Sequence, residues 1–497
     1  MKKKYILTAL ALSALSFSAC RKELLNPAPQ TFIAAETGFS TPSRIGNQLL
    51  SLYSTFKNGN FYGGRYIVYN DIRGEDFIAE TSNLITGADV AQLNLTNSAT
   101  SVKAFWLQAY LTINRCNVFI DGMAASGTAT LGNPALANNY IAEARLLRAV
   151  SYYSLLQLFA RPYADKAGAN PGVPLRLKGL TGGENYDLAK SSVAEVYNQV
   201  VADLNFAKTN LPVTNSSAYN NTTRAHRNTA IALLMRTYLS MQKYNEVITE
   251  SANVVSATAP YTAPSGVPNT LQADITNVFK TPYTTTESIF SAPFTNATGD
   301  LSGTQNQLGF YFLQAATVIG AAEYRLNENG IIANPLFKST DKRRAFVAPG
   351  AASGPGVGKF FCAKYPGAAS SGYLDYAPVI RYSEVLLTLA EARARVAAAT
   401  AAPDVQALAL LNAVHRRSDE TTLFAPATNA DLINLILTER RIEFFGEGLR
   451  SPDIMRLLQT IPAKGSAPQK SLGETGYIWP ISSDEISLNK LIGGDNN

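Results

Sequence analysis

The sequence is poor in the side chains that bind metals and in those that form disulfides. Only three cysteines and two histidines occur among its 497 residues. No close Cys/His spacing is present, so a zinc site has no support from the sequence. Cys116 and Cys362 are so far apart in the chain that their spacing gives no indication of a disulfide. We expect both to be buried free thiols.

Basic runs and catalytic motifs are also missing. Lysines and arginines are scattered among acids, and the formal charge of +6 falls to about +3 without Lys2, Lys3 and Lys4. This pattern gives no support for nucleic-acid binding. The chain has no GxSxG, HExxH, P-loop or dinucleotide pattern, which predicts neither enzyme activity nor a cofactor. Glu75 and Asp76 are adjacent and lack the fixed separation that glycoside hydrolysis needs, so a solvated or calcium-coordinating loop is expected there.

No apolar run is long enough to span a membrane, but a shorter one lies near the amino terminus. It occupies residues 6–17, follows three lysines and is followed by Ser18, Ala19 and Cys20. This order is typical of a signal peptide, here 1–19, and it resembles a bacterial lipoprotein signal. That resemblance implies a lipid on Cys20, with 20–41 as a proline-containing tether. An ordinary secretory signal with a chance cysteine is the alternative.

The rest of the chain is rich in helical patterns. With 46% hydrophobic and 16% charged residues it can form one large or two moderate cores. Apolar periodicity predicts helices at 42–56, 103–123, 142–160, 192–210, 224–241, 244–255, 381–396 and 405–417. Ser192 and Glu195 form a capping box at the start of one of them. The pairs within 224–255 and 381–417 have the order of tetratricopeptide units.

A less regular region separates these helical pairs. Residues 256–378 are dominated by Pro, Gly, Thr, Ser and Asn, with short β-like runs such as 288–292. This length is too great for a connector, so we expect a loop-rich lobe with a few strands. The predicted fold is mostly α, with tetratricopeptide-like helical pairs as a scaffold. Its two regions are 42–255 and 256–497, and binding is expected on the loops.

Residues 437–459 mix charged and bulky apolar side chains unusually closely. On a continuous helix Arg440 meets Glu443 three residues later. Glu447 meets Arg450 in the same way. We therefore predict ion pairs inside the fold, because a buried charge needs a partner. A surface helix with incidental ion pairs is the alternative.

This segment resembles the C-terminal signature of the SusD/RagB family. The matching residues are Glu439, Arg440, Arg441, Phe445, Gly446, Glu447, Gly448, Arg450, Asp453 and Arg456. Ser451 and Pro452 depart from the family, which tends to have an aromatic residue before the aspartate. Further matches are Trp106, Tyr110, Ile113, Asn114, Arg115 and Asn117, then Glu143, Arg145, Arg148, Tyr152 and Phe159, then Pro480, Ile481 and Glu485.

The resemblance implies a lipid-anchored protein on the cell surface at the outer membrane. Such a protein has no catalytic activity and delivers a nutrient to a SusC-like TonB-dependent transporter. Most members are thought to take glycans, whereas the RagB branch takes peptides. We expect an oligosaccharide ligand; the alternatives are a peptide ligand, or a lipid-anchored tetratricopeptide scaffold that binds a protein partner.

Aromatic and acidic residues of two segments are the candidates for ligand contact. Residues 59–77 combine glycines with tyrosines and acids, which suit stacking on sugars and bonding to hydroxyls. Both tryptophans fall on family framework positions, which leaves tyrosine and phenylalanine for a sugar platform. The candidates are Tyr62, Tyr66, Tyr69, Asp71, Phe310, Tyr311 and Tyr324. The alternative is that these side chains pack their loops onto the core.

Overall fold

The computed structural model describes residues 37–182, 185–297, 299–300, 303–314, 321–352, 356–367 and 374–496. The predicted signal peptide, most of the tether and Cys20 therefore lie outside the described residues. None of the described helices combines the length and the apolar character needed to cross a bilayer.

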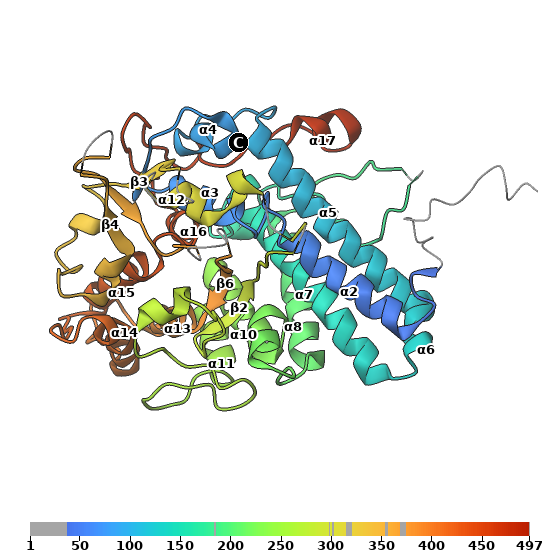
Figure 1. Ribbon diagram of the computed structural model, residues 1–497, viewed down its shortest axis with the longest axis horizontal. Helices are drawn as coiled ribbons and strands as arrows, with labels where there is room; N and C mark the ends of the chain where they lie inside the picture. Colours follow the sequence, from blue (N-terminus) through green and yellow to red (C-terminus); the bar gives the residue numbers. More distant parts are fainter. Residues whose placement is uncertain are drawn as a thin grey trace, which may run out of the picture.

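Six helices from the first half of the described chain pack together in one group. They are α2 (Pro42–Phe56), α5 (Thr100–Gly122), α7 (Pro134–Phe159), α8 (Val193–Asn210), α10 (Arg227–Ser240) and α11 (Tyr244–Ser251). Figure 1 shows α2, α5 and α7 side by side, and α7 also packs on α8. Helix α7 lies inside this group because its second half is apolar on nearly every face. The predicted capping box of Ser192 and Glu195 is confirmed at the start of α8.

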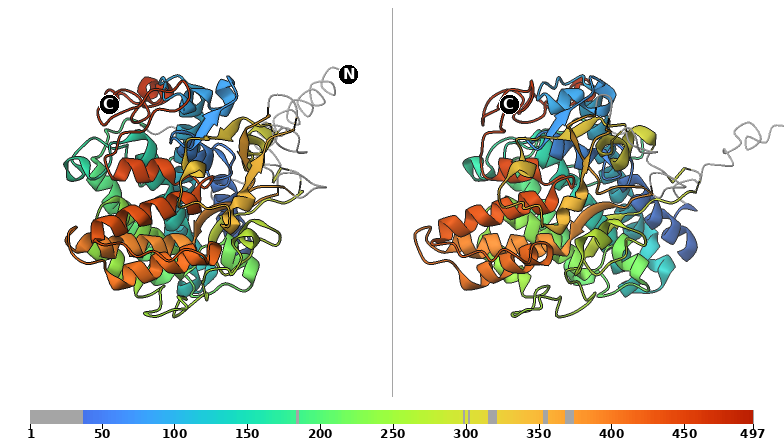
Figure 2. Two further views of the ribbon diagram at one scale, coloured as in Figure 1. Left: turned by 90° about the vertical axis from the view of Figure 1, so that its left-hand side faces the viewer. Right: turned by 60° about the vertical axis from the view of Figure 1, so that its left-hand side comes forward.

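Three C-terminal helices form a second group, seen face-on in orange and red in Figure 2. This group consists of α13 (Tyr382–Val396), α14 (Val405–Ser418) and α15 (Asn429–Phe444). Two further C-terminal helices lie outside it, because α16 (Arg450–Arg456) packs on α10 and α17 (Ser483–Leu488) lies beside α5 (Figure 1). Helix α13 packs against α14 as the predicted pair, and it also contacts α11 and α15. The mostly helical fold class is confirmed.

The region between the two groups carries the strands. A four-stranded antiparallel sheet has the order β1 (Phe77–Ala79), β3 (Tyr324–Leu326), β5 (Phe360–Cys362) and β4 (Val347–Pro349). A separate pair joins β2 (Ser288–Ala292) to β6 (Ala377–Arg381), with Ser288 opposite Arg381 and Ala292 opposite Ala377. The predicted β-like run at 288–292 is thus a strand.

Short helices connect these parts. They are α3 (Arg65–Ile72), α4 (Ala88–Ala91), α6 (Thr128–Leu131), α9 (Ala218–Thr223), α12 (Leu308–Phe312), the π-helical η3 (Met123–Gly127), and the 3-10 turns η2 (Leu84–Thr86), η4 (Asp165–Gly168), η5 (Ile275–Phe279), η6 (Thr304–Asn306), η7 (Ile331–Ala333) and η8 (Lys342–Phe346). Helix α3 corrects the expectation of an irregular segment at 59–77. Gly64 precedes α3 where a Cβ atom would lie 1.6 Å from the carbonyl oxygen of Asn306, so the chain needs glycine there.

The charged segment at 437–459 is buried, as predicted, but its ion pairs are not the predicted ones. Helix α15 ends at Phe444, and Gly446 and Gly448 follow with φ of 79° and 76°, in the left-handed region that favours glycine. The two halves of the segment therefore do not form one helix. Arg440 pairs with Asp453 at 2.9 Å instead of with Glu443, and Arg450 pairs with Glu75 at 2.5 Å instead of with Glu447.

The glutamates of this segment bind cations from other parts of the chain. Glu443 binds Arg343, Arg381 and Arg417. Glu447 binds Lys364 at 2.6 Å and also Arg381 at 2.6 Å. These side chains are almost fully buried, and together we call Glu443, Glu447, Arg343, Arg381, Arg417, Lys364 and Glu287 the buried charge cluster.

Candidate functional site

Six of the seven predicted ligand-contact residues lie in the core. Tyr62, Tyr66, Tyr69, Asp71, Tyr311 and Tyr324 are at most 5% exposed, and Phe310 is half-buried. The five tyrosine rings contact other core rings; Tyr62, for example, stacks on Phe56 with 4.5 Å between ring centroids. The five tyrosine rings are thus enclosed in the core, and the assignment of these residues to ligand contact stays a prediction.

The acids of the same segment bind protein groups. Asp71 accepts a hydrogen bond from the backbone N–H of Gly448 at 2.8 Å, and burial raises its pKa well above the ordinary value. Glu75 and Asp76 correct the expected solvated or calcium-coordinating loop, because they are buried and paired with Arg450 and Arg441. Among the described residues, no group of three or more His, Cys, Asp or Glu is placed to hold a metal ion.

The cysteines take no part in a site within the described structure. Cys116 and Cys362 are buried and unpaired, as predicted. Burial raises the pKa of each thiol to about 12, so neither is a reactive thiolate near neutral pH.

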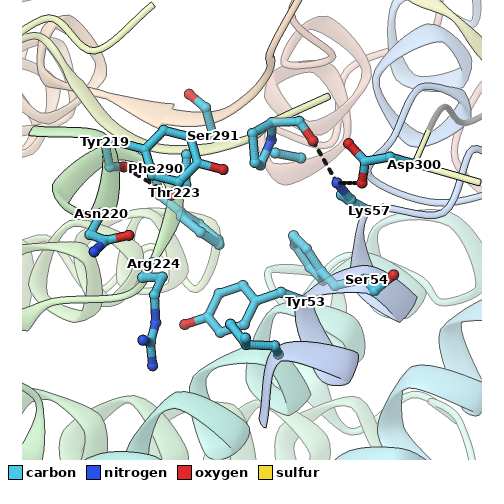
Figure 3. Close-up of a pocket in the computed structure, with 14 residues that line it drawn as sticks. Tyr53, Ser54, Lys57, Tyr219, Asn220, Thr223, Arg224, Phe290, Ser291 and Asp300 are labelled. Carbon is cyan, nitrogen blue, oxygen red and sulfur yellow. Dashed lines mark hydrogen bonds and ion pairs between the residues drawn. The ribbon is translucent and has the colours of Figure 1, made fainter. Parts of the chain in front are cut away.

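A pocket of about 250 Å³ opens between α2, α9 and β2 (Figure 3), and we call it the α2–β2 pocket. Its lining consists of Leu50, Tyr53, Ser54, Phe56, Lys57, Tyr219, Asn220, Thr223, Arg224, Phe290, Ser291, Ala292, Pro293 and Asp300. The inner part is aromatic, because Phe56 stacks on Phe290 at 5.9 Å and Tyr53 meets the edge of Phe290 at 6.2 Å. The outer part is polar and carries the ring of Tyr219, which is 45% exposed.

Lys57 and Asp300 form an ion pair at one end of the pocket (Figure 3). The ammonium group of Lys57 also donates to the carbonyl oxygen of Pro293 at 2.8 Å. The second carboxylate oxygen of Asp300 accepts from the backbone N–H and the hydroxyl of Thr295, at 2.7 and 2.8 Å. Burial raises the pKa of Asp300, but the hydrogen bonds from Lys57 and Thr295 outweigh burial and lower it. Asp300 is therefore held as a carboxylate in a fixed orientation.

Arg224 lies at the other end and is held by a buried glutamate. Its Nη2 and Nε donate to the two carboxylate oxygens of Glu143 at 2.6 and 3.1 Å. The hydroxyl of Tyr53 donates to the same carboxylate at 2.5 Å and accepts from the backbone N–H of Ala225 at 3.0 Å. This bidentate arrangement fixes the guanidinium plane beside the Tyr53 ring (Figure 3).

A second aromatic pair lies close to the pocket. Tyr376 stacks on Tyr283 with 4.7 Å between ring centroids. Burial, together with the smaller effects of Tyr219 and Asp300, raises the pKa of Tyr376 to about 12. Tyr376 is half-buried, and its hydroxyl interacts electrostatically with Tyr219 and Asp300, two residues that line the pocket.

A larger groove of about 520 Å³ lies elsewhere, between α5 and α17. Exposed Leu107 and Leu488 stand on its two sides. The side-chain amide of Asn114 is occupied by the protein, because it accepts from the backbone N–H of Leu180 at 2.7 Å and donates to the carbonyl of Leu180 at 2.9 Å. This groove is more apolar than the α2–β2 pocket and suits sugar hydroxyls less well.

Sequence reasoning missed the charged and aromatic residues of the α2–β2 pocket. Lys57, Asp300 and the nearby residues Tyr219 and Arg224 come from three segments that are far apart in the chain and meet only in the folded protein. The available signal was Tyr219, a lone aromatic side chain among the small polar residues at 214–223.

Comparisons with known proteins agree on one family. A model described as the SusD family matches residues 333–494, and one described as "Starch-binding associating with outer membrane" matches residues 28–239. The SusD-like protein P2 of Formosa agariphila is 24% identical over 545 aligned positions, covering 99% of each chain.

Solved structures with this fold include a SusD superfamily protein from Bacteroides fragilis. It is 29% identical, with a TM-score of 0.78 over 92% of this chain and 99% of that protein. A laminarin-binding SusD-like protein is 20% identical, with a TM-score of 0.71 over 92% of this chain and 99% of that protein. Its identity is low enough that it indicates the fold alone. With two matching family models and these relatives, the chain belongs to the SusD/RagB family.

Proposed function

We propose that the chain binds oligosaccharides in the α2–β2 pocket, outside the cell, and presents them to a SusC-like TonB-dependent transporter. A lipid on Cys20 would hold it at the outer membrane. The observation that carries the proposal is the pocket itself, an aromatic cavity with an exposed tyrosine and polar groups at its mouth. The family description as starch-binding supports a carbohydrate as the ligand class.

The lining matches the two kinds of contact that a sugar needs. The exposed ring of Tyr219 offers a face on which the apolar side of a sugar ring can stack. The exposed Ser54 hydroxyl and the Asn220 side chain offer hydrogen bonds to sugar hydroxyls. A volume of about 250 Å³ is below the usual range for drug-sized ligands, so the pocket would hold one part of a chain while the rest lies along the rim.

The same lining suits capture without cleavage. Among the described residues that line the pocket, Asp300 is the one carboxylate, and it is bound to Lys57 and Thr295. Glycoside hydrolysis by the usual route needs two carboxyl groups on opposite sides of the bond that breaks. The proposed role is therefore binding and delivery.

Calorimetry with the purified chain tests the ligand class and the site. Maltooligosaccharides, laminari-oligosaccharides and a set of oligopeptides are titrated into the wild type and into Tyr219→Ala. Loss of one stacking face should weaken sugar binding by about 3-fold to 10-fold. Tyr186→Ala is the matched control, because Tyr186 is similarly exposed at 47% but lines the α5–α17 groove.

Each outcome bears on a different part of the proposal. Equal sugar affinity of Tyr219→Ala and the wild type would place the ligand elsewhere. Binding of oligopeptides but of no carbohydrate would favour the peptide-binding alternative. Isolation of the chain from membranes with a partner other than a TonB-dependent transporter, together with no nutrient binding, would favour the scaffold alternative.

A further inference from the structure

Both cations that line the α2–β2 pocket already have a carboxylate partner. Lys57 is paired with Asp300, and Arg224 is paired with Glu143 behind the pocket wall. The described lining contains no other charged side chain. Two positive and two negative charges therefore meet at the pocket, and their formal sum is zero.

The two carboxylates cannot easily turn away from their cations. Thr295 holds one oxygen of Asp300 through two hydrogen bonds. Both oxygens of Glu143 are engaged by Arg224, and one of them also accepts from Tyr53. The side chain of Glu143 is only 5% exposed, so water does not replace a lost partner. An anionic ligand that took Arg224 for itself would leave the desolvated carboxylate of Glu143 without its cation. An anionic ligand that took Lys57 would lie against the carboxylate of Asp300, which Thr295 holds in place.

From this geometry we infer that the α2–β2 pocket selects uncharged glycan segments and rejects those that carry sulfate or uronate at the bound residue. The inference rests on the proposed function and narrows its substrate class. The selection is by repulsion, since Asp300 and the carboxylate behind Arg224 oppose a second negative charge, while hydroxyl groups meet no such penalty.

The test compares neutral and anionic oligosaccharides on the wild type and on Asp300→Asn. A glycan array identifies the tightest neutral and the tightest anionic ligand, and calorimetry at low salt then measures both dissociation constants. The wild type should bind neutral glycans and reject sulfated and uronate ones. Asn at position 300 removes a negative charge but not the side-chain shape, so the preference for neutral over anionic ligand should fall about tenfold. High salt should restore the preference, because the released Lys57 charge is then screened.

Asp484→Asn is the matched control. Asp484 also pairs with a lysine, Lys103 at 2.9 Å, but it is well exposed on α17 and does not line the pocket. This substitution should leave the neutral-to-anionic preference unchanged. If Asp484→Asn relaxes the preference as much as Asp300→Asn, the overall charge of the protein sets selectivity and the inference is wrong.

Glycan-array binding of the wild type tests the selection for uncharged glycans even if Asp300→Asn does not fold. Anionic glycans bound as tightly as neutral ones, or more tightly, would overturn the inference while leaving oligosaccharide binding intact. Absence of binding to every carbohydrate, with binding to peptides, would instead remove the proposed function and the inference with it.

Discussion

Glu443 is the residue whose change should affect the fold most clearly. Its carboxylate is fully buried and lies 2.8 Å from a nitrogen of Arg381 and 2.9 Å from one of Arg343, with Arg417 closer still. Burial raises the pKa of Glu443, but the three arginines, Arg417 first, outweigh burial and hold it well below the ordinary value. The group is therefore ionised in the folded protein, and Glu443→Gln removes one full charge from the buried charge cluster.

The magnitude follows from what this substitution leaves behind. Removing one partner of a buried ion pair costs about 3 to 5 kcal/mol, because the remaining charge is desolvated and uncompensated. Glutamine keeps the shape and can still accept a hydrogen bond, so we expect a value near the lower end, about 3 kcal/mol. A folded body of about 450 residues has an unfolding entropy of about 1 kcal/mol per kelvin, which converts this loss to a fall in Tm of about 3 °C.

Scanning calorimetry of Glu443→Gln beside Glu420→Gln measures the effect. Glu420 makes the same kind of contact, with Lys342 at 3.4 Å, but its side chain is 75% exposed. An exposed pair contributes less than about 1 kcal/mol, so Glu420→Gln should shift Tm by less than about 1 °C. Equal Tm values for the two variants would refute the view that the cluster holds compensated charges in a low-dielectric interior.

Two further predictions concern acid sensitivity and the turn after α15. His226 bonds the carbonyl of Ile289, and burial lowers the pKa of its imidazole to about 4. The free energy of unfolding should therefore fall by about 3 kcal/mol as pH falls from 6.5 to 4, because the unfolded chain binds the proton first. His226→Gln should flatten this part of the pH profile of urea unfolding, and an unchanged slope would show that His226 does not cause the loss. Gly448→Ala should lower the free energy of unfolding by about 2 to 4 kcal/mol, because φ is 76° and the new Cβ would lie 2.8 Å from Cα of Ile67. Gly46→Ala in α2 is its control: the new Cβ meets open space, so urea unfolding should show a gain of about 0.5 to 1 kcal/mol.

Helix positions were predictable because their signals are local. Helix α2 occupies the predicted 42–56, since Thr41 caps it and Ile45, Leu49 and Leu52 repeat at the spacing of one face. Helix α8 runs from its capping box to Asn210 as predicted. Each of these features depends on residues within one or two turns of the chain.

Ion-pair partners were not predictable, because they depend on distant segments. The spacing of Arg440 and Glu443 permits a pair on one helix face, yet Glu443 binds arginines from three other elements. Two glycines with positive φ interrupt the segment and turn Arg450 toward Glu75. Helical spacing says which residues share a face, and the tertiary fold decides what that face meets.

The aromatic candidates show the same limit. Tyrosines and acids in a glycine-rich segment suit both a ligand loop and an enclosed helix, and composition does not separate the two. Helix α3 is enclosed, so Tyr66 and Tyr69 became core residues. The groups around the α2–β2 pocket come instead from helices α2 and α9 and from the segment after β2.

The buried charge cluster and the pocket are physically connected through β2. Glu287, which directly precedes β2, accepts hydrogen bonds from Arg381 and Arg417, the same arginines that bind Glu443. Its backbone carbonyl also accepts from the N–H of Tyr382, so the start of β2 is fixed against the end of β6. The wall of the pocket, from Phe290 to Pro293, follows within a few residues. The cluster therefore holds the start of the strand from which the wall continues, while the pairing of β2 with β6 holds the wall itself.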